Sequence, residues 1–276
     1  MSVTVRDVRA FKERGERFVM LTAYDYPTAR ILDEAGIPLL LVGDSVADNE
    51  LGYPNTIPVT IEEMLHHTRA VSRGATNALI VGDMPFMSYQ ASLEDGIRNA
   101  GRFLKEGGAN AVKVEGGVIE LTAALVERGV PVMGHLGLTP QSVNAMGGFR
   151  VQGRTEEAVR RLMDHADALA KAGAFALVLE GMPAEVGKRI TESVEIPTIG
   201  IGAGPDCDGQ VLVYHDLLGL TEGHLPRFVK RYANLSRETR DALDAYAAEV
   251  RSGAFPGEEH TYAMPAEELA AFESEG

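Results

Sequence analysis

Short apolar runs recur along the chain, and segments with helical spacing of apolar residues separate them. Amphipathic segments such as 61–75 and 155–173 carry apolar residues three and four positions apart. Apolar runs that alternate with helices are typical of parallel strands. The expected strands span residues 18–24, 39–45, 78–85, 111–117, 131–137, 176–183, 197–204 and 211–217.

Eight strand–helix units of this period predict a (βα)8 TIM barrel, although a doubly wound open sheet would give similar local patterns. A polar helix expected over residues 3–14 precedes the first strand as an N-terminal capping helix. No linker or low-complexity stretch divides the chain, so residues 1–276 are expected to form one domain. Residues 236–253 should supply a last helix, and residues 263–276 read as an acidic C-terminal extension.

Four of the expected strands end in an acidic residue. Asp44 follows LLLVG, Asp83 follows LIVG, Glu115 ends AVKVE and Glu180 ends LVLE. Because the carboxyl ends of parallel strands meet at one edge of a barrel, these acids should gather at its catalytic mouth. Crowded carboxylates repel one another unless a hard cation or a raised pKa relieves the repulsion, and metal-assisted proton chemistry uses both.

Asp44 and Asp83 share the tripeptide Val-Gly-Asp and lie one strand–helix unit apart, close enough to share an ion. Oxygen ligands without a Cys or His cluster favour Mg²⁺ or a similar divalent cation. Glu115 adds a third acid from the next strand. The alternative is that each aspartate only caps the helix that follows it.

Lys113 lies two residues before Glu115, so both side chains project from the same face of the strand. The lysine is available to bind a substrate carboxylate, and a structural Lys113–Glu115 ion pair is the alternative. Glu180 follows the apolar run Ala-Leu-Val-Leu opposite the proposed metal site, which favours a general base. His135 in GHLGLTPQS is either a candidate substrate contact or a hydrogen-bonded histidine without a catalytic role.

The charge balance argues against a nucleic-acid partner, because 40 acids against 26 bases give a net charge of −14. Such a surplus fits either a high-salt cytoplasm or an ordinary acidic enzyme. No apolar stretch is long enough for a membrane span, and residues 1–17 are too polar for a signal peptide, so we expect a cytoplasmic protein that binds no membrane. The single cysteine, Cys207, agrees with a reducing compartment and is interpreted as incidental.

Several long motifs resemble the ketopantoate hydroxymethyltransferase family. They are TAYDYPTA (22–29), LLLVGDS (39–45), TIPVTIEEMLHHTRAVSRGA (56–75), KVEGG (113–117), GHLGLTPQSVN (134–144), GGFRVQGR (147–154), IGIGAGPDCDGQVLVYHD (199–216) and FPGEEHTY (255–262). The resemblance implies a barrel enzyme that transfers a hydroxymethyl group from 5,10-methylenetetrahydrofolate to 3-methyl-2-oxobutanoate through a metal-stabilised enolate. The product would be 2-dehydropantoate, for pantothenate and coenzyme A synthesis.

The resemblance also assigns residues. It implies Mg²⁺ ligands at Asp44, Asp83 and Glu115, substrate contacts at Asp44, Ser45, Asp83 and Lys113, and a proton acceptor at Glu180. It further implies a homo-oligomer, commonly a decamer, that acts on small molecules.

The chain departs from the family pattern after the second strand, where GDSVADNELGYPNT replaces a GDSLGM-like start and introduces Asp48 and Glu50. The loop at 46–60 is long enough to act as a lid. The departure affects this expected lid and the contacts to the one-carbon donor. Two alternative functions stay open at this point. One is another metal-dependent lyase or aldolase acting on a 2-oxo acid, and the other is a metabolite-binding barrel without turnover.

Overall fold

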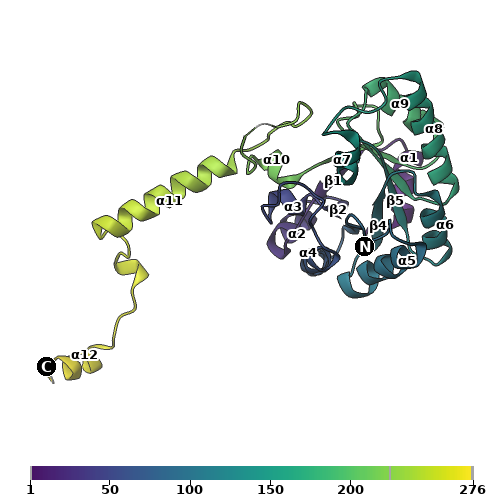
Figure 1. Ribbon diagram of the computed structural model, residues 1–276. Helices are drawn as coiled ribbons and strands as arrows, with labels where there is room; N and C mark the ends of the chain where they lie inside the picture. The colour runs from purple at the N-terminus through teal and green to yellow at the C-terminus, as the bar shows by residue number, and fades with distance from the viewer. Residues whose placement is uncertain (1, 224, 275–276) are drawn as a thin grey trace.

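Eight parallel strands close into a barrel in which each strand pairs with its sequence neighbours and β8 pairs with β1 (Figure 1). This closed barrel confirms the predicted TIM barrel. The computed structural model describes residues 2–223 and 225–274. The strands are β1 (Phe18–Thr22), β2 (Leu39–Val42), β3 (Leu79–Asp83), β4 (Ala111–Glu115), β5 (Val132–Gly137), β6 (Ala176–Glu180), β7 (Thr198–Ile201) and β8 (Gly209–Leu212).

The helices begin where the sequence offers capping side chains. Thr60, for example, accepts a hydrogen bond from Glu63 N, and the Glu63 carboxylate accepts one from Thr60 N in return. A π-helical turn, Phe103–Gly107, extends α5, and 3₁₀ turns occur at Pro140–Ser142 and Glu258–His260. The helices that connect the strands are α2 (Tyr26–Glu34), α3 (Val46–Asn49), α4 (Ile61–Gly74), α5 (Leu93–Arg102), α6 (Ile119–Glu127), α7 (Val143–Met146), α8 (Glu156–Lys171) and α9 (Ala184–Ser193).

The inside of the barrel is apolar at its amino-terminal end. Alternate residues of the strands pack there in one buried cluster, which includes Leu39 and Leu41 of β2, Leu79 and Val81 of β3, Met133 of β5 and Val178 of β6. Helix α1 (Val5–Glu13) contributes its buried Val8 to the same cluster. The polar N-terminal helix thus closes this end of the barrel, as predicted, and leaves the carboxyl ends of the strands for chemistry.

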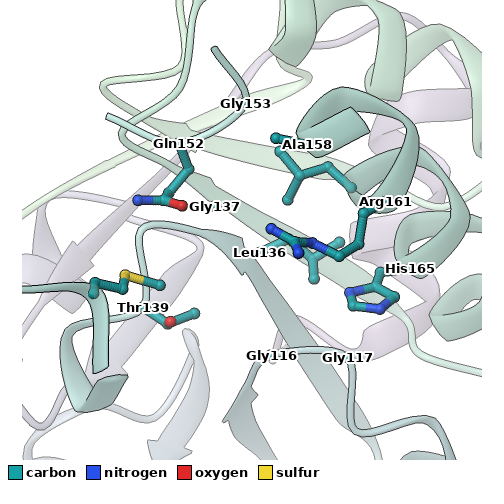
Figure 2. A pocket seen from close by; sticks show the side chains of 12 residues that line it. Gly116, Gly117, Leu136, Gly137, Thr139, Gln152, Gly153, Ala158, Arg161 and His165 are labelled. Atoms are coloured by element: carbon teal, nitrogen blue, oxygen red, sulfur yellow. The ribbon is translucent and has the colours of Figure 1, made fainter. Parts of the chain in front are cut away.

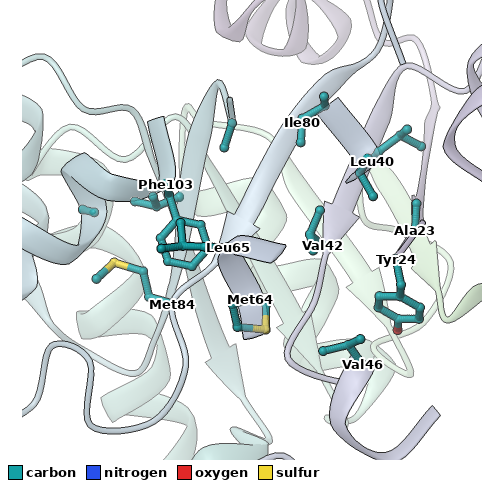
Figure 3. Close-up of a cluster of buried hydrophobic side chains, with 14 of the residues drawn as sticks. Ala23, Tyr24, Leu40, Val42, Val46, Met64, Leu65, Ile80, Met84 and Phe103 are labelled. Carbon is teal, nitrogen blue, oxygen red and sulfur yellow. The ribbon is translucent and has the colours of Figure 1, made fainter. Parts of the chain in front are cut away.

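The outward-facing strand residues pack against the helices (Figure 3). Leu40, Val42 and Ile80 belong to a cluster with Met64 and Leu65 of α4. The Phe103 ring fills the space where a side chain at Gly82 would lie, so β3 requires glycine there. Strands buried on both faces explain the near-continuous apolar runs in the sequence.

The eighth strand differs from the expectation of 211–217. It spans Gly209–Leu212 and is followed by the short helix α10 (Tyr214–Leu218). The backbone N–H of Tyr214 donates to Thr22 Oγ1 at 3.0 Å, which ends the pairing with β1 and turns the chain out of the barrel.

The C-terminal helices α11 (Leu235–Ser252) and α12 (Ala266–Ser274) extend away from the barrel and bury none of their side chains (Figure 1). The predicted last helix forms, but it does not cover the barrel wall. Assignment of the whole chain to one domain stays a prediction. Among the described residues, no helix has both the length and the apolar character that a bilayer span requires.

Candidate active site

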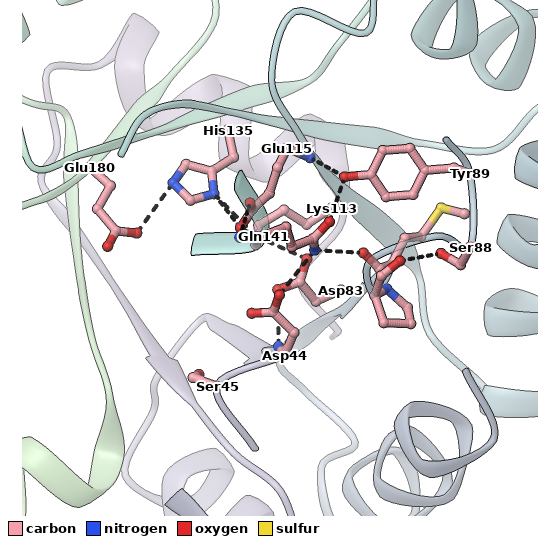
Figure 4. Close-up of polar contacts among 12 residues, drawn as sticks. Asp44, Ser45, Asp83, Ser88, Tyr89, Lys113, Glu115, His135, Gln141 and Glu180 are labelled. Carbon is pink, nitrogen blue, oxygen red and sulfur yellow. Dashed lines mark hydrogen bonds and ion pairs between the residues drawn. The ribbon is translucent and has the colours of Figure 1, made fainter. Parts of the chain in front are cut away.

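The strand register brings the predicted residues together at the carboxyl ends of the strands. Asp83 pairs with Lys113, Glu115 with His135, and Gly137 with Glu180. These residues continue the alternate positions whose earlier members face the inside of the barrel, so their side chains point into its mouth. The prediction that the acids share one edge is confirmed (Figure 4).

Lys113 lies at the centre of this group and is only 4% exposed. Its Nζ lies 2.9 Å from Asp83 Oδ1, 3.5 Å from Glu115 Oε1 and 3.2 Å from His135 Nδ1. Burial lowers the pKa of this ammonium group, but the nearby carboxylates outweigh burial and raise it above its usual value. The Lys113–Glu115 ion pair considered from sequence is present, and the contact to Asp83 is closer.

Asp44 and Asp83 are adjacent, because the Asp44 N–H donates to Asp83 Oδ2 at 3.1 Å. Burial raises the pKa of Asp83, although the charge of Lys113 acts to lower it. The pKa of Asp44 is raised further, by burial and by the negative charges of Asp83 and Glu115. Neither carboxylate caps the helix that follows it, so the capping alternative is wrong at both positions. Asp83 Oδ1 is buried and accepts no hydrogen bond of suitable angle from the described residues.

His135 bridges two acids. Its Nδ1 lies 3.2 Å from Glu115 Oε1, and its Nε2 lies 3.2 Å from Glu180 Oε2. Burial and the charge of Lys113 lower the pKa of His135, but its interactions with Glu115 and Glu180 outweigh both and raise it to about 9. In Glu115, burial is in turn outweighed by Lys113 and His135, which lower the pKa of the carboxyl group.

Ser45 lies beside Asp44 at the start of α3, and its Oγ is 2.8 Å from the Tyr24 hydroxyl. Glu180 occupies the other side of the mouth on β6, and its side chain remains 17% exposed. The carboxylate opposite the Asp44–Asp83 pair is therefore reachable by a molecule that enters the mouth.

Sequence reasoning missed Gln141, which lies in the turn Pro140–Ser142 and is 4% exposed. Its side-chain amide donates to Asp44 Oδ2 at 3.0 Å and to Met84 O at 3.0 Å, and its backbone N–H donates to Glu115 Oε2 at 3.1 Å. The Tyr89 hydroxyl donates to Gln141 Oε1 at 2.9 Å and accepts from Glu115 N at 3.1 Å. The only signal for Gln141 was its place in the motif GHLGLTPQSVN.

The loop that departs from the family pattern reaches α10. Glu50 Oε1 lies 3.0 Å from His215 Nε2, and the His215 ring stacks on Tyr24 with centroids 5.5 Å apart. Since Tyr24 contacts Ser45, this pair packs behind one side of the mouth.

A cavity of about 150 Å³ lies at the ends of β4 and β5 (Figure 2), and none of the four acids at the strand ends is among its lining residues. Its lining includes Gly116 and Gly137 at the ends of β4 and β5, Gln152 and Gly153 of the following loop, and Arg161 and His165 of α8.

Comparison with known proteins identifies the family. The model of the family described as ketopantoate hydroxymethyltransferase matches residues 2–258. The chain is 58% identical over 269 residues to the 3-methyl-2-oxobutanoate hydroxymethyltransferase of Carboxydothermus hydrogenoformans, with 97% of this chain and 98% of that protein covered. The chain belongs to the ketopantoate hydroxymethyltransferase family.

A second relative in this family, from Thermobifida fusca, is 58% identical over 263 residues and covers 95% of this chain and 94% of its own. Solved structures share the fold at much lower identity. Phosphonopyruvate hydrolase, in a complex with oxalate and Mg²⁺, superposes with a TM-score of 0.60 at 14% identity, over 99% of this chain and 95% of that one. 2,3-Dimethylmalate lyase, a member of the PEP mutase/isocitrate lyase superfamily, gives a TM-score of 0.58 at 16% identity over 100% of both chains.

Proposed function

We propose that this enzyme transfers a hydroxymethyl group from 5,10-methylenetetrahydrofolate to 3-methyl-2-oxobutanoate, forming 2-dehydropantoate for pantothenate synthesis. Family membership supports the acceptor and the product. The observation that supports this chemistry is that two kinds of site face each other across the barrel mouth. A buried lysine and two adjacent carboxylates lie on β2–β4, and a partly exposed carboxylate lies on β6.

A divalent cation fits the donor set on β2 and β3. Asp44 and Asp83 offer hard oxygen ligands from adjacent strand ends, and the buried Asp83 Oδ1 lies 2.9 Å from Lys113 Nζ. Among the described residues, no three acidic, His or Cys side chains already converge on one point. The Glu115 oxygens are directed to Lys113, His135 and the Gln141 N–H. We therefore assign Asp44 and Asp83 as direct ligands and Glu115 as a ligand through water.

When bound, the cation supplies positive charge to the keto oxygen and carboxylate of the 2-oxo acid. Lys113 adds a fixed positive charge for the substrate carboxylate in a site where burial strengthens the attraction. The Ser45 hydroxyl lies at the edge of the same site and can donate a hydrogen bond to the substrate.

Glu180 accepts the proton from C3 of the substrate, the carbon beside the keto group. His135, whose pKa is raised to about 9, lies 3.2 Å from Glu180 Oε2 and orients that carboxylate. C3 then forms a bond to the methylene carbon of the donor, water adds a hydroxyl group to that carbon, and both of its C–N bonds to the donor break. The proton taken from C3 and one proton of the water go to the two nitrogens, so that tetrahydrofolate leaves. The barrel mouth orients the two reactants, which removes much of the entropic barrier.

A turnover assay tests this function. Protein incubated with 3-methyl-2-oxobutanoate, 5,10-methylenetetrahydrofolate and Mg²⁺ should form 2-dehydropantoate, and a chelator should stop the reaction. Cleavage of 2-oxo acids without a one-carbon donor, with no 2-dehydropantoate formed, would instead identify a lyase or aldolase.

A further inference from the structure

The cavity beside the active site is attached to the strand end that carries Glu180. Gly137 lines the cavity and pairs in register with Glu180, and the next residue, Leu138, donates its N–H to Glu180 O at 2.8 Å. The Gln152 N–H donates to Gly181 O at 2.8 Å and fixes the loop over the cavity. The cavity therefore begins one strand away from the residue proposed as the base.

The cavity wall combines one arginine and one histidine with apolar groups. Arg161 and His165 of α8 line it together with Leu136, Leu162 and Met146 (Figure 2). A Cβ atom at Gly117 would lie 2.7 Å from His165 Cε1, so only glycine leaves room for the imidazole at this wall. Such a wall suits a ligand that carries a carboxylate on an apolar stem.

Arg161 brings a permanent positive charge to the lining of this cavity, although the chain as a whole carries a charge of −14. Residues 147–161 contain four arginines and two glutamates. Among the residues that the structure describes, no carboxylate lies within ion-pair distance of Arg150, Arg154 or Arg161. Arg160, the neighbour of Arg161, pairs with Glu156 at 2.8 Å. Arg161 thus faces the cavity with its charge uncompensated, and a guanidinium binds a carboxylate in a two-pronged geometry.

The size of the cavity limits what it can hold. A volume of about 150 Å³ matches an engineered cavity that holds a single benzene ring, so a whole pterin donor does not fit. Phe149, in the segment that leads to Gln152, is 63% exposed.

We propose that this cavity binds the glutamyl carboxylate end of the one-carbon donor, with Arg161 as its ionic partner. The proposal rests on the proposed function, since that function supplies a donor whose p-aminobenzoyl stem ends in a glutamate. The reacting methylene lies at Glu180, and the tail lies between the barrel wall and α8. The cavity then selects donors that carry the tail.

Two donors that differ only in the tail test this assignment. The enzyme is assayed with 5,10-methylenetetrahydrofolate and with 5,10-methylenetetrahydropteroate, which lacks the glutamate. In Arg161→Gln, the ratio of kcat/KM with the tail to kcat/KM without it should fall about tenfold, the usual scale for losing one charge-assisted contact. Arg160→Gln removes the same charge from the same helix and should keep the wild-type ratio.

Equal losses on both donors in Arg161→Gln, or an unchanged ratio, would overturn the proposal. Calorimetry with p-aminobenzoylglutamate gives a readout that needs no turnover. Wild type and Arg160→Gln should bind it, whereas Arg161→Gln should not. Calorimetry with free glutamate distinguishes recognition of the tail from binding of any small anion. If wild type used neither donor, the proposed function would fail while calorimetry still decided what the cavity binds. Absence of binding to wild type at millimolar concentration would reject the site.

Discussion

Replacing Gln141 with leucine should destabilise the fold more than any surface substitution of the same size. The change keeps the side-chain volume roughly constant but removes the amide that donates to Asp44 Oδ2 and to Met84 O. It also removes the acceptor of the Tyr89 hydroxyl. All of these groups lie in buried surroundings, where a lost partner leaves a polar group unsatisfied.

The magnitude follows from these contacts. A hydrogen bond to a charged group contributes about 1.5–3 kcal/mol, and each neutral buried group left unpaired costs about 1–3 kcal/mol. Protonation of Asp44, whose pKa burial raises, relieves part of the loss. We therefore expect a total near the low end, about 3–5 kcal/mol. At about 2–4 °C per kcal/mol for a domain of this size, the apparent Tm should fall by roughly 6–20 °C.

Thermal unfolding of metal-free protein, followed by circular dichroism, measures this change. Gln210→Leu is the matched control, because Gln210 is exposed and its side-chain amide donates to Gly204 O. Its Tm should stay within about 2 °C of wild type. A Gln141→Leu protein as stable as the control would show that the amide does not hold the carboxylates in place.

Three further changes test the charges and the backbone of the site. Burial raises the folded-state pKa of Asp44 above its ordinary value of 3.8, so ionisation of Asp44 destabilises the metal-free fold increasingly as pH rises. Asp44→Asn should therefore raise Tm near pH 8 but not near pH 4. Equal Tm changes at the two pH values would contradict this. Lys113→Met leaves buried Asp83 without its ionic partner, so we expect about 3–5 kcal/mol lower stability by denaturant unfolding. The KM for the 2-oxo acid should rise at least about tenfold. An unchanged KM would show that the substrate carboxylate does not bind at Lys113. A Cβ at Gly137 would overlap Glu180 O, so Gly137→Ala should displace Glu180 and lower kcat. Gly36→Ala is the control, because Gly36 also has a positive φ but its Cβ would meet nothing within 4 Å. Similar kcat values in the two variants would show that Glu180 is not displaced.

The sequence was sufficient to predict the residues at the strand ends. Asp44, Asp83, Glu115 and Glu180 follow apolar runs, and parallel strands bring such positions to one edge whatever the details of packing. Gln141 could not be found this way, because its contacts reach β2 and β3 from a loop after β5. No local pattern records a contact of that range.

The end of the barrel was harder to predict for a related reason. Residues 211–217 continue an apolar pattern, but the hydrogen bond from Tyr214 N to Thr22 Oγ1 ends the strand after Leu212. Residues 236–253 have helical periodicity, and they form α11, but periodicity does not determine which surface a helix packs against.

In the proposed reaction, Glu180 removes the proton from C3 of the substrate. This role is measured by loss of deuterium from 3-methyl-2-oxobutanoate labelled at that carbon, in the presence of Mg²⁺ and without a one-carbon donor. Glu180→Gln keeps the size of the side chain and its hydrogen-bonding reach but cannot accept the proton. Exchange should fall by about 10²–10⁴ relative to wild type and to Glu185→Gln, an exposed control on α9. Exchange by Glu180→Gln at the wild-type rate would contradict the account.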